Sequence, residues 1–291
     1  MSGQASTAAR PEGADTTTRA PSGGSDGRDR ARRRPPPRLV EVVSVAQLAP
    51  WLVSVRLAGP NLSGFEALAP TSHIKIFLPA AGEDAPRLPE LVGGGPAWPE
   101  GATPPVVRTY TPRRYDQSAG TLEVQFVLHG AGPASDWAEQ AKVGDRIGVA
   151  GPGGRFSFDP ADGRWWIAGD ESAIPAIGTL LDALPASARA EVHLEVGDDR
   201  DEVPLSSRAE TTVVWHHRRQ PDAWGDDLYS AASGATVAKG TRVWVACEAM
   251  AVRRIRKHLL VDRQFPAGAL VTRGYWRLGA AGHPDHDYGD D

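Results

Sequence analysis

Four side chains with complementary binding chemistry lie close together in the sequence: Arg108, Tyr110, Thr111 and Arg113. On a β-strand, alternation places Arg108 and Tyr110 on one face and Thr111 on the other, unless the chain bends at the proline that follows. With that bend the segment can wrap a ligand, because the planar guanidinium groups of Arg108 and Arg113 offer bidentate contacts to phosphate. The spacing alone fits an edge strand with solvated arginines equally well.

A second candidate segment follows one strand later and reads His-Gly-Ala-Gly-Pro-Ala-Ser-Asp-Trp, from His129 to Trp137. Glycines such as Gly132 let the backbone approach a ligand closely, and a helix that begins near Ala134 would direct free N–H groups at an anion. Ser135 adds a hydroxyl donor. A helix N-terminus alone is a weak signal, and a lone tryptophan is more often part of a core, so the interpretation depends on the pairing of the two segments.

Together the two segments resemble those of the siderophore-interacting proteins, a branch of the flavin reductases of the ferredoxin-reductase type. The resemblance covers about residues 38–279 and implies an FAD site. It implies that Tyr110 stacks on the isoalloxazine, that Thr111 hydrogen-bonds near its redox nitrogen, and that Arg108 and Arg113 neutralise phosphate. The other FAD contacts that it implies are His129, Gly132, Ala134, Ser135 and Trp137. For His129, a satisfied core histidine is the alternative.

These segments need a scaffold, and residues 39–158 read as short β-type runs separated by glycine and proline. That rhythm predicts a small antiparallel β-barrel. The expected strands are Leu39–Val45, Trp51–Ala58, His73–Leu78, Val106–Thr111, Leu122–His129 and Arg146–Ala150, with one helix at Pro133–Lys142. In the fifth run every second residue is large and apolar, which predicts one face on the core: Leu122, Val124, Phe126 and Leu128. The segment Leu88–Pro105 reads as a long inserted loop.

After Gly163 strands alternate with helices, which predicts a parallel, doubly wound sheet. The expected strands are Trp165–Ala168, Ala190–Val196, Thr211–His216, Thr241–Ala246 and Ala269–Tyr275, with helices at Ser172–Leu184 and Glu248–Val261. The fold class is therefore a two-domain β plus α/β protein. We expect a disordered tail at 1–37, an FAD-binding β-barrel domain at 38–160, an NAD(P)H-binding α/β domain at 161–279 and an acidic flexible tail at 280–291.

The composition suits a soluble protein of this size. The chain has 291 residues, of which 41% are hydrophobic and 23% charged, and no apolar run approaches the ~20 residues of a membrane helix. We therefore expect no membrane insertion. The single cysteine, Cys247, excludes an intramolecular disulfide and multi-cysteine metal sites, so we expect a location in the reducing cytoplasm. The Arg-rich N-terminal tail lacks interleaved aromatic residues, which argues against nucleic-acid binding.

In the second domain, Asp170, Glu171 and Ser172 join the first strand to its helix. Asp170 and Glu171 suit a helix dipole but would repel a pyrophosphate. The sequence Gly-Asp-Glu-x-Ala-x-Pro-Ala is similar to that of the siderophore-interacting proteins at this point, which implies that these three residues lie near NAD(P)H. The resemblance also places Glu248 near the nicotinamide, where wider relatives carry a glycine. Cys247 reads as a buried small hydrophobe rather than a reactive thiol.

Two further groups of basic residues are candidates for ligand charges. Arg218 and Arg219 are candidates for a 2′-phosphate, and a solvated turn explains them equally well. In the family, basic residues around the flavin attract an anionic ferric siderophore, which implies a cationic pocket formed by Lys75, Arg155 and Arg277. Each of these three alone would more often be a surface charge.

We expect no metal site. The histidines and aspartates of the C-terminal tail, His283, Asp285, His286 and Asp287, have ligand chemistry, but a glycine-rich tail without supporting residues predicts that they are solvated.

The function that the resemblance implies is FAD-dependent reduction of a ferric siderophore. NADPH or NADH passes hydride to the flavin, which gives single electrons to Fe(III), and Fe(II) is released for iron assimilation. We expect a monomer. Two alternatives stay open: a reductase of the same fold that takes its electrons from ferredoxin, and a non-catalytic protein that binds ferric siderophore. A generic flavin reductase serving an oxygenase is a third, and it would leave the Gly-Tyr-Trp-Arg ending unexplained.

Overall fold

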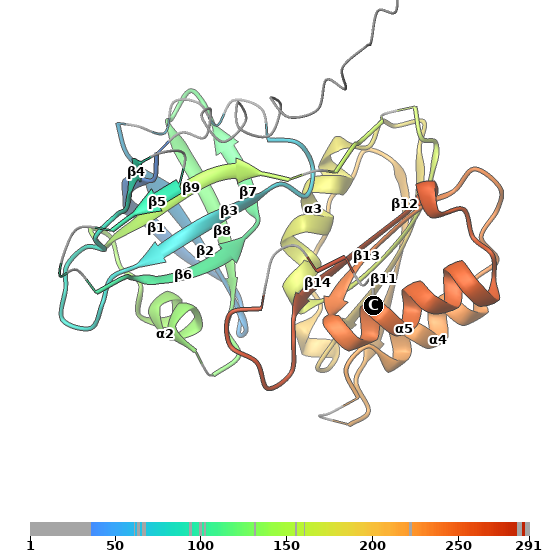
Figure 1. Cartoon of the computed structure of the whole chain (residues 1–291). Helices are drawn as coiled ribbons and strands as arrows, with labels where there is room; N and C mark the ends of the chain where they lie inside the picture. The colour runs from blue at the N-terminus through green and yellow to red at the C-terminus, as the bar shows by residue number, and fades with distance from the viewer. Residues whose placement is uncertain are drawn as a thin grey trace, which may run out of the picture.

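The computed structural model describes residues 36–288, apart from gaps at 61, 63–64, 66–67, 93–94, 99–100, 102, 131, 155, 160, 221–222 and 284–286. Two sheets follow one another along the chain, and each has its own hydrophobic core (Figure 1). The tail expected at 1–37 lies almost wholly outside the described residues. None of the described helices is long and apolar enough to cross a membrane.

The first sheet is antiparallel and seven-stranded, in the order β6-β3-β9-β1-β2-β8-β7, which confirms the predicted class of the first domain. Its strands are β1 (Arg38–Ala49), β2 (Leu52–Ala58), β3 (His73–Leu78), β6 (Val106–Tyr110), β7 (Pro112–Asp116), β8 (Thr121–Val127) and β9 (Arg146–Gly153). Helix α2 (Pro133–Gln140) lies beside it.

The bend expected after Thr111 is present and shapes this sheet. Thr111 alone separates β6 from β7, yet these two strands stand at opposite ends of the strand order. The sheet must therefore curl until its two ends lie one residue apart. Hydrogen bonding across that junction, which would close a barrel, stays a prediction.

Side-chain alternation on β8 follows the sequence pattern. Leu122, Val124 and Phe126 are fully buried in the first core, and Leu128 packs against the same core. One expectation needs correction: the segment read as a loop contains a short hairpin of β4 (Glu90–Val92) and β5 (Gly95–Ala97).

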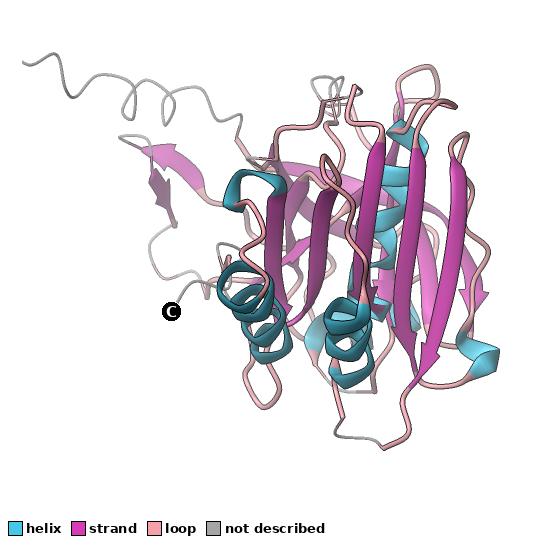
Figure 2. Cartoon of the chain, turned by 90° about the vertical axis from the view of Figure 1, so that its right-hand side faces the viewer, coloured by secondary structure: helices cyan, strands magenta, loops and turns pink. Residues whose placement is uncertain are grey.

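The second sheet is parallel, in the order β12-β11-β10-β13-β14, as expected of a doubly wound domain. Its strands are β10 (Arg164–Asp170), β11 (Arg189–Val196), β12 (Glu210–His217), β13 (Arg242–Glu248) and β14 (Leu270–Trp276). Helix α3 (Ile174–Ala183) covers the face toward the first domain, whereas α4 (Asp226–Gly234) and α5 (Ala249–Lys257) cover the other (Figures 1 and 2). Helix α4 was not expected from the sequence.

Successive residues of β10 supply the two faces of this sheet. Trp165 and Ile167 join the core under α3, and Trp166 joins the core under α4 and α5. At the end of the strand, a Cβ added to Gly169 would lie 2.6 Å from the Cβ of Ala173, so only glycine lets the chain turn this closely into the next helix.

The two domains are held together by polar and aromatic contacts. The Trp51 indole donates to the carbonyl of Asp201 (3.1 Å), and the Thr71 N–H donates to the hydroxyl of Thr179 on α3 (2.9 Å). Phe156 and Phe158, in the connection between the sheets, pack against the core under α3. These contacts fix the side of the first domain that faces α3.

The C-terminal segment differs from the expected solvated tail at two residues. The His283 ring bonds to the Asp287 carboxylate (2.9 Å), which also accepts from Arg253 (3.0 Å), and the His283 and Asp287 side chains are 8% and 6% exposed. The solvated reading is therefore wrong for both, because an arginine on α5 gives the carboxylate a partner that sequence spacing does not reveal. Asp285 and His286 lie outside the described residues.

Candidate functional site

The expected flavin-stacking residue, Tyr110, ends strand β6 and packs on the first core. Its ring centroid lies 4.5 Å from that of Phe126, which in turn lies 5.4 Å from Trp137 on α2. Burial raises the pKa of Tyr110 above its usual range, so its hydroxyl stays protonated at neutral pH. The three rings link the two predicted FAD segments through one aromatic cluster.

Thr111 lies where the two domains meet. Its side chain is buried and lies close enough to the side chain of Tyr275, on β14 of the parallel sheet, to lower the pKa of that phenol. Burial has the larger effect and raises the pKa of Tyr275 to about 12. The residue expected beside the redox nitrogen of a flavin is thus contacted by the second domain, at the carboxyl end of a parallel strand. That end is where open α/β sheets bind their ligands.

The two candidate phosphate-binding arginines have different surroundings. Arg108 donates to the carbonyl of Val107 (2.9 Å). Arg113 forms an ion pair with Asp182 on α3 (2.5 Å) and lies over Gly178, where an added Cβ would be 2.9 Å from Nε of Arg113. In this structure Arg113 therefore contacts the second domain, and a phosphate contact for it stays a prediction.

The start of α2 has the features of an anion site. Gly132 precedes the helix with φ at 102°, and no side chain caps the first N–H groups. The hydroxyl of Ser135 accepts from the N–H of His129 (3.1 Å), which closes the loop onto the helix, while the His129 side chain is exposed. Ala134 and Ser135 are buried. An uncapped helix end beside an aromatic cluster is chemically suited to the pyrophosphate and ring of FAD.

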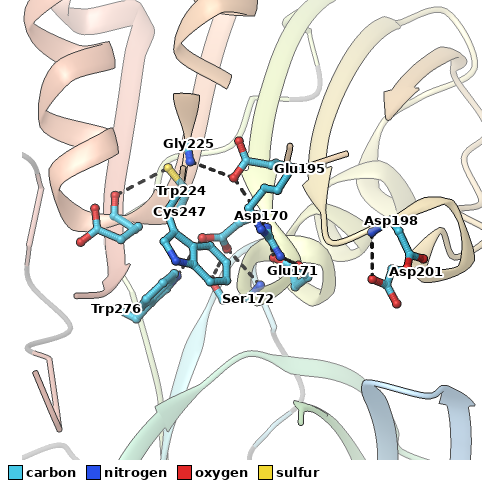
Figure 3. A network of polar contacts seen from close by, with 12 residues as sticks. Asp170, Glu171, Ser172, Glu195, Asp198, Asp201, Trp224, Gly225, Cys247 and Trp276 are labelled. Atoms are coloured by element: carbon cyan, nitrogen blue, oxygen red, sulfur yellow. Dashed lines mark hydrogen bonds and ion pairs between the residues drawn. The ribbon is translucent and has the colours of Figure 1, made fainter. Parts of the chain in front are cut away.

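At the carboxyl end of β10, Asp170 has a fully satisfied carboxylate. Oδ1 accepts from the N–H (3.0 Å) and hydroxyl (2.5 Å) of Ser172, and Oδ2 accepts from the indole of Trp276 (2.8 Å; Figure 3). Asp170 is only 2% exposed. Burial, and then the negative charge of Glu171, raise the pKa of Asp170 to about 7. Asp170 therefore changes charge near neutral pH.

Glu171 is paired with an arginine that lies 47 residues later in the chain. Nη1 of Arg218 donates to Glu171 (3.0 Å), Nη2 bonds to its other carboxylate oxygen, and the guanidinium stacks 3.9 Å from the ring of Trp224. Nη1 also lies 3.6 Å from the buried Glu195, which accepts from the N–H of Gly225 (2.8 Å). The expected repulsion between Glu171 and a pyrophosphate is therefore reduced by the charge of Arg218.

Glu248 begins α5 as its capping residue. Its Oε2 accepts from the N–H groups of Met250 (2.6 Å) and Ala251 (3.0 Å), and its Oε1 accepts from the N–H of Leu278 (3.3 Å). These hydrogen bonds give Glu248 a structural role at a position where wider relatives have glycine. A contact between Glu248 and a nicotinamide stays a prediction. Cys247 is fully buried, and burial raises the pKa of its thiol, which suits a small hydrophobe.

The three cations expected around the substrate come from separate segments of the chain. The ammonium of Lys75 donates to Thr109 on β6 (2.7 Å), on the face of the sheet opposite to Tyr110 and Ile74. Arg277 is exposed in the turn after β14, and Arg155 lies outside the described residues. A shared pocket for these three stays a prediction.

Three aromatic residues of the second domain were missed as site residues: Tyr275, Trp276 and Trp224. Trp224 meets Trp276 edge to face, with ring centroids 4.7 Å apart, so it connects Arg218 to Asp170 through two indoles (Figure 3). The Tyr-Trp pair was visible in the sequence as part of the Gly-Tyr-Trp-Arg motif, whereas Trp224 stood in a segment without any motif.

Comparison with family models divides the chain as the two sheets do. Residues 41–156 match the siderophore-interacting FAD-binding domain, and residues 163–279 match the model named siderophore-interacting protein. The ferric vibriobactin reductase ViuB of Vibrio cholerae is 34% identical over 249 residues, covering 84% of this chain and 90% of that protein.

Solved structures give the same picture. A siderophore utilization protein from T. fusca superposes with a TM-score of 0.77 at 34% identity, covering 86% of this chain and 96% of that one. The siderophore-interacting protein SipS from Aeromonas hydrophila superposes with a TM-score of 0.70 at 27% identity, covering 84% and 93%. The ferredoxin reductase of carbazole 1,9a-dioxygenase, at 19% identity and a TM-score of 0.59, shares the fold, with 82% of this chain and 69% of that chain covered.

Proposed function

The chain belongs to the siderophore-interacting protein family, and on that premise we propose that it is an FAD-dependent reductase of ferric siderophores. It is an oxidoreductase of the ferredoxin-reductase-like fold with an FAD-binding first domain. We propose a nicotinamide dinucleotide as the electron donor and a ferric siderophore as the acceptor, with Fe(II) released for iron assimilation.

The contact between Thr111 and Tyr275 is the observation that carries the proposal. It joins the strand expected to hold the flavin ring to the carboxyl end of a parallel strand, where a dinucleotide would bind. Electron transfer from donor to flavin requires the two ligands to meet between the domains. The proximity of Thr111 and Tyr275 is one of the contacts between the two domains.

The proposed roles of the FAD-facing residues follow from their positions. Tyr110 would lie against the isoalloxazine with Phe126 behind it, and Thr111 would donate a hydrogen bond near the reacting edge. The uncapped start of α2 and the guanidinium of Arg108 would bind the phosphates. Bound FAD supplies the conversion of a two-electron hydride donor into single electrons.

Reduction is a chemically sufficient way to release iron. Siderophore oxygens are hard donors that hold Fe(III) far more tightly than Fe(II), so the reduced metal dissociates. The protein need not ligate the iron, and among the described residues no group of three His, Cys, Asp or Glu side chains is placed to hold a metal. We propose that Lys75, Arg155 and Arg277 attract the anionic complex by their charge.

We further propose that the protein acts as a monomer in the cytoplasm. One cysteine, fully buried, suits a reducing compartment. Reduced ferredoxin is the alternative electron donor, because the acidic residues that follow β11, Asp198, Asp199 and Asp201, do not favour binding of the phosphates of a dinucleotide.

The test is an anaerobic absorption experiment on the FAD-loaded protein. NADH or NADPH is added first, followed by a ferric catecholate together with a coloured Fe(II)-specific chelator. Flavin bands that bleach and then recover as Fe(II) appears would support the proposal. If reduced ferredoxin bleaches the flavin bands but neither nucleotide does, ferredoxin replaces the nucleotide as the electron donor. A protein that cannot be loaded with FAD would refute the proposal of a reductase.

A further inference from the structure

Arg218 is the basic side chain best placed for a 2′-phosphate, but its binding surfaces are already occupied. Both of its terminal nitrogens bond to Glu171, one of them lies 3.6 Å from Glu195, and its flat face stacks on Trp224. The Arg218 side chain is only 9% exposed. A guanidinium recognises a phosphate through the same paired N–H groups, so a 2′-phosphate would have to displace a carboxylate.

The position of this ion pair in the fold decides which part of a dinucleotide it would meet. Strands β10 and β11, joined through α3, form the first βαβ unit of the sheet. In such units the adenine ribose lies at the end of the second strand, where an acid accepts a bond from its 2′-hydroxyl or an arginine accepts its 2′-phosphate. Here the second strand is β11, which contains Glu195 and ends at Val196.

The charge at this end of β11 is predominantly negative. Asp198 and Asp201 follow the strand, each bonded to a backbone N–H of the same turn, and Asp199 lies between them (Figure 3). Arg200 balances one of these acids, since it pairs with Asp198 (2.7 Å). A dianionic group is repelled here, whereas a hydroxyl can donate to a carboxylate.

We propose that this site takes NADH and discriminates against NADPH, and that the Glu171–Arg218 ion pair is the determinant of that choice. The inference depends on the proposed use of a nicotinamide dinucleotide as electron donor. Displacement of Glu171 from Arg218 would leave a poorly solvated carboxylate without its partner beside a second buried acid, and that arrangement is strongly unfavourable.

Binding calorimetry on the full-length FAD-loaded protein tests the choice without any electron transfer. ADP-ribose and 2′-phospho-ADP-ribose represent the adenine halves of NADH and NADPH. We expect ADP-ribose to bind at least about tenfold more tightly. Equal affinities, or tighter binding of the 2′-phosphate form, would overturn the proposal.

The variant Glu171→Gln should reduce or reverse the preference for ADP-ribose over its 2′-phosphate form, because it removes one negative charge and frees the paired N–H groups of Arg218. The ratio of the two affinities should shift by about tenfold toward the 2′-phosphate form. Arg208→Gln, an exposed arginine at the other end of β12, is the matched control and should leave the ratio unchanged. If Arg219→Gln selectively weakened the 2′-phosphate form, Arg219 would be the phosphate ligand and the proposal would fail.

A milder variant covers the case in which Glu171→Gln does not fold. Asp199→Asn removes an exposed acid at the end of β11 without touching the ion pair, so it should shift the ratio in the same direction by a smaller factor. An unchanged ratio in this variant would contradict the electrostatic argument.

Failure of this inference can be separated from failure of the proposed function. Protein whose flavin has been reduced with dithionite is mixed with a ferric catecholate and the Fe(II) chelator. If Fe(II) appears while neither ADP-ribose form binds, the proposed reductase function is supported and the proposed dinucleotide specificity is refuted. If the reduced flavin does not yield Fe(II), the function itself is refuted, whatever the nucleotide preference.

Discussion

Nη1 of Arg113 lies 2.5 Å from the carboxylate of Asp182, so an arginine on β7 of the antiparallel sheet is ion-paired to α3 of the parallel sheet. The same guanidinium is one of the two, with that of Arg108, to which the family resemblance assigns a flavin phosphate. Asp182 and a phosphate would compete for it, because both bind through its paired N–H groups. The ion pair therefore links the affinity for FAD to the contact between the domains.

Replacing each partner of this pair separates the two roles. Arg113→Gln should weaken FAD binding by about tenfold if the guanidinium contacts phosphate, whereas Asp182→Asn should leave it unchanged or tighten it. Both should lower the free energy of unfolding by about 1 kcal/mol or less, since the Asp182 side chain is 37% exposed. Flavin fluorescence and chemical denaturation measure the two quantities. An equal loss of FAD affinity in both variants would show that Arg113 acts only through the domain contact.

Tyr110 should contribute to flavin binding through its ring rather than its hydroxyl. Tyr110→Phe keeps the ring contact with Phe126 and should retain FAD, while Tyr110→Ala should release it with an affinity loss of about tenfold or more. Equilibrium dialysis against FAD measures the affinity. Thermal unfolding of the FAD-free proteins is the control, because the alanine variant also loses packing in the first core. If Tyr110→Ala bound FAD normally, Tyr110 would be a core residue only.

Asp170 should make the FAD-free protein less stable as pH rises. Its pKa is raised to about 7 in the folded protein, mainly by burial, from its usual value of 3.8. A raised pKa means that folding favours the protonated form, so the stabilisation is present below about pH 4 and is lost by about pH 7, up to roughly 4 kcal/mol. Asp170→Asn should flatten this part of the profile of unfolding free energy against pH. An unaltered profile would contradict the assignment.

His216 should give the opposite slope at mildly acidic pH. Its Nε2 lies 3.0 Å from Nδ1 of His193, and burial, followed by the charge of His193, lowers its pKa below 6.5. A lowered pKa means that folding favours the neutral ring, so stability is lost as pH falls below about 6.5. In urea titrations, His216→Gln should reduce this acid loss. His217→Gln, at the exposed neighbouring position, should not reduce it, and equal effects of the two variants would disprove the explanation by the His193–His216 pair.

Local sequence patterns predicted much of the fold because they act over a few residues. Alternation on β8 identified Leu122, Val124 and Phe126 as one buried face. Helix α4 was missed since its start, Gly225, adopts φ of 73° and offers no capping side chain. The bend after Thr111 was expected from Pro112, but the strand that follows it was not.

The candidate site was only partly predictable, because its decisive contacts join distant segments. Glu171 and Arg218 were both recognised as charged candidates, yet their pairing across 47 residues depends on the neighbouring positions of β10, β11 and β12 in the sheet. Thr111 was expected to contact a flavin, whereas its proximity to Tyr275 depends on how the two domains are placed relative to each other. Spacing within a motif carries no information about such partners.

The C-terminal segment has a practical consequence for handling this protein. Strand β14 is an edge of the parallel sheet, and its Gly274 N–H donates to the carbonyl of Asp287 (2.9 Å) while the Thr272 hydroxyl donates to that of Tyr288 (2.5 Å). The segment at Asp287 and Tyr288 thereby covers part of the edge of β14, whose unpaired backbone groups could otherwise pair with a strand of another molecule. Removal of the residues from Asp287 onward would expose these groups of β14 and is expected to favour self-association through this edge.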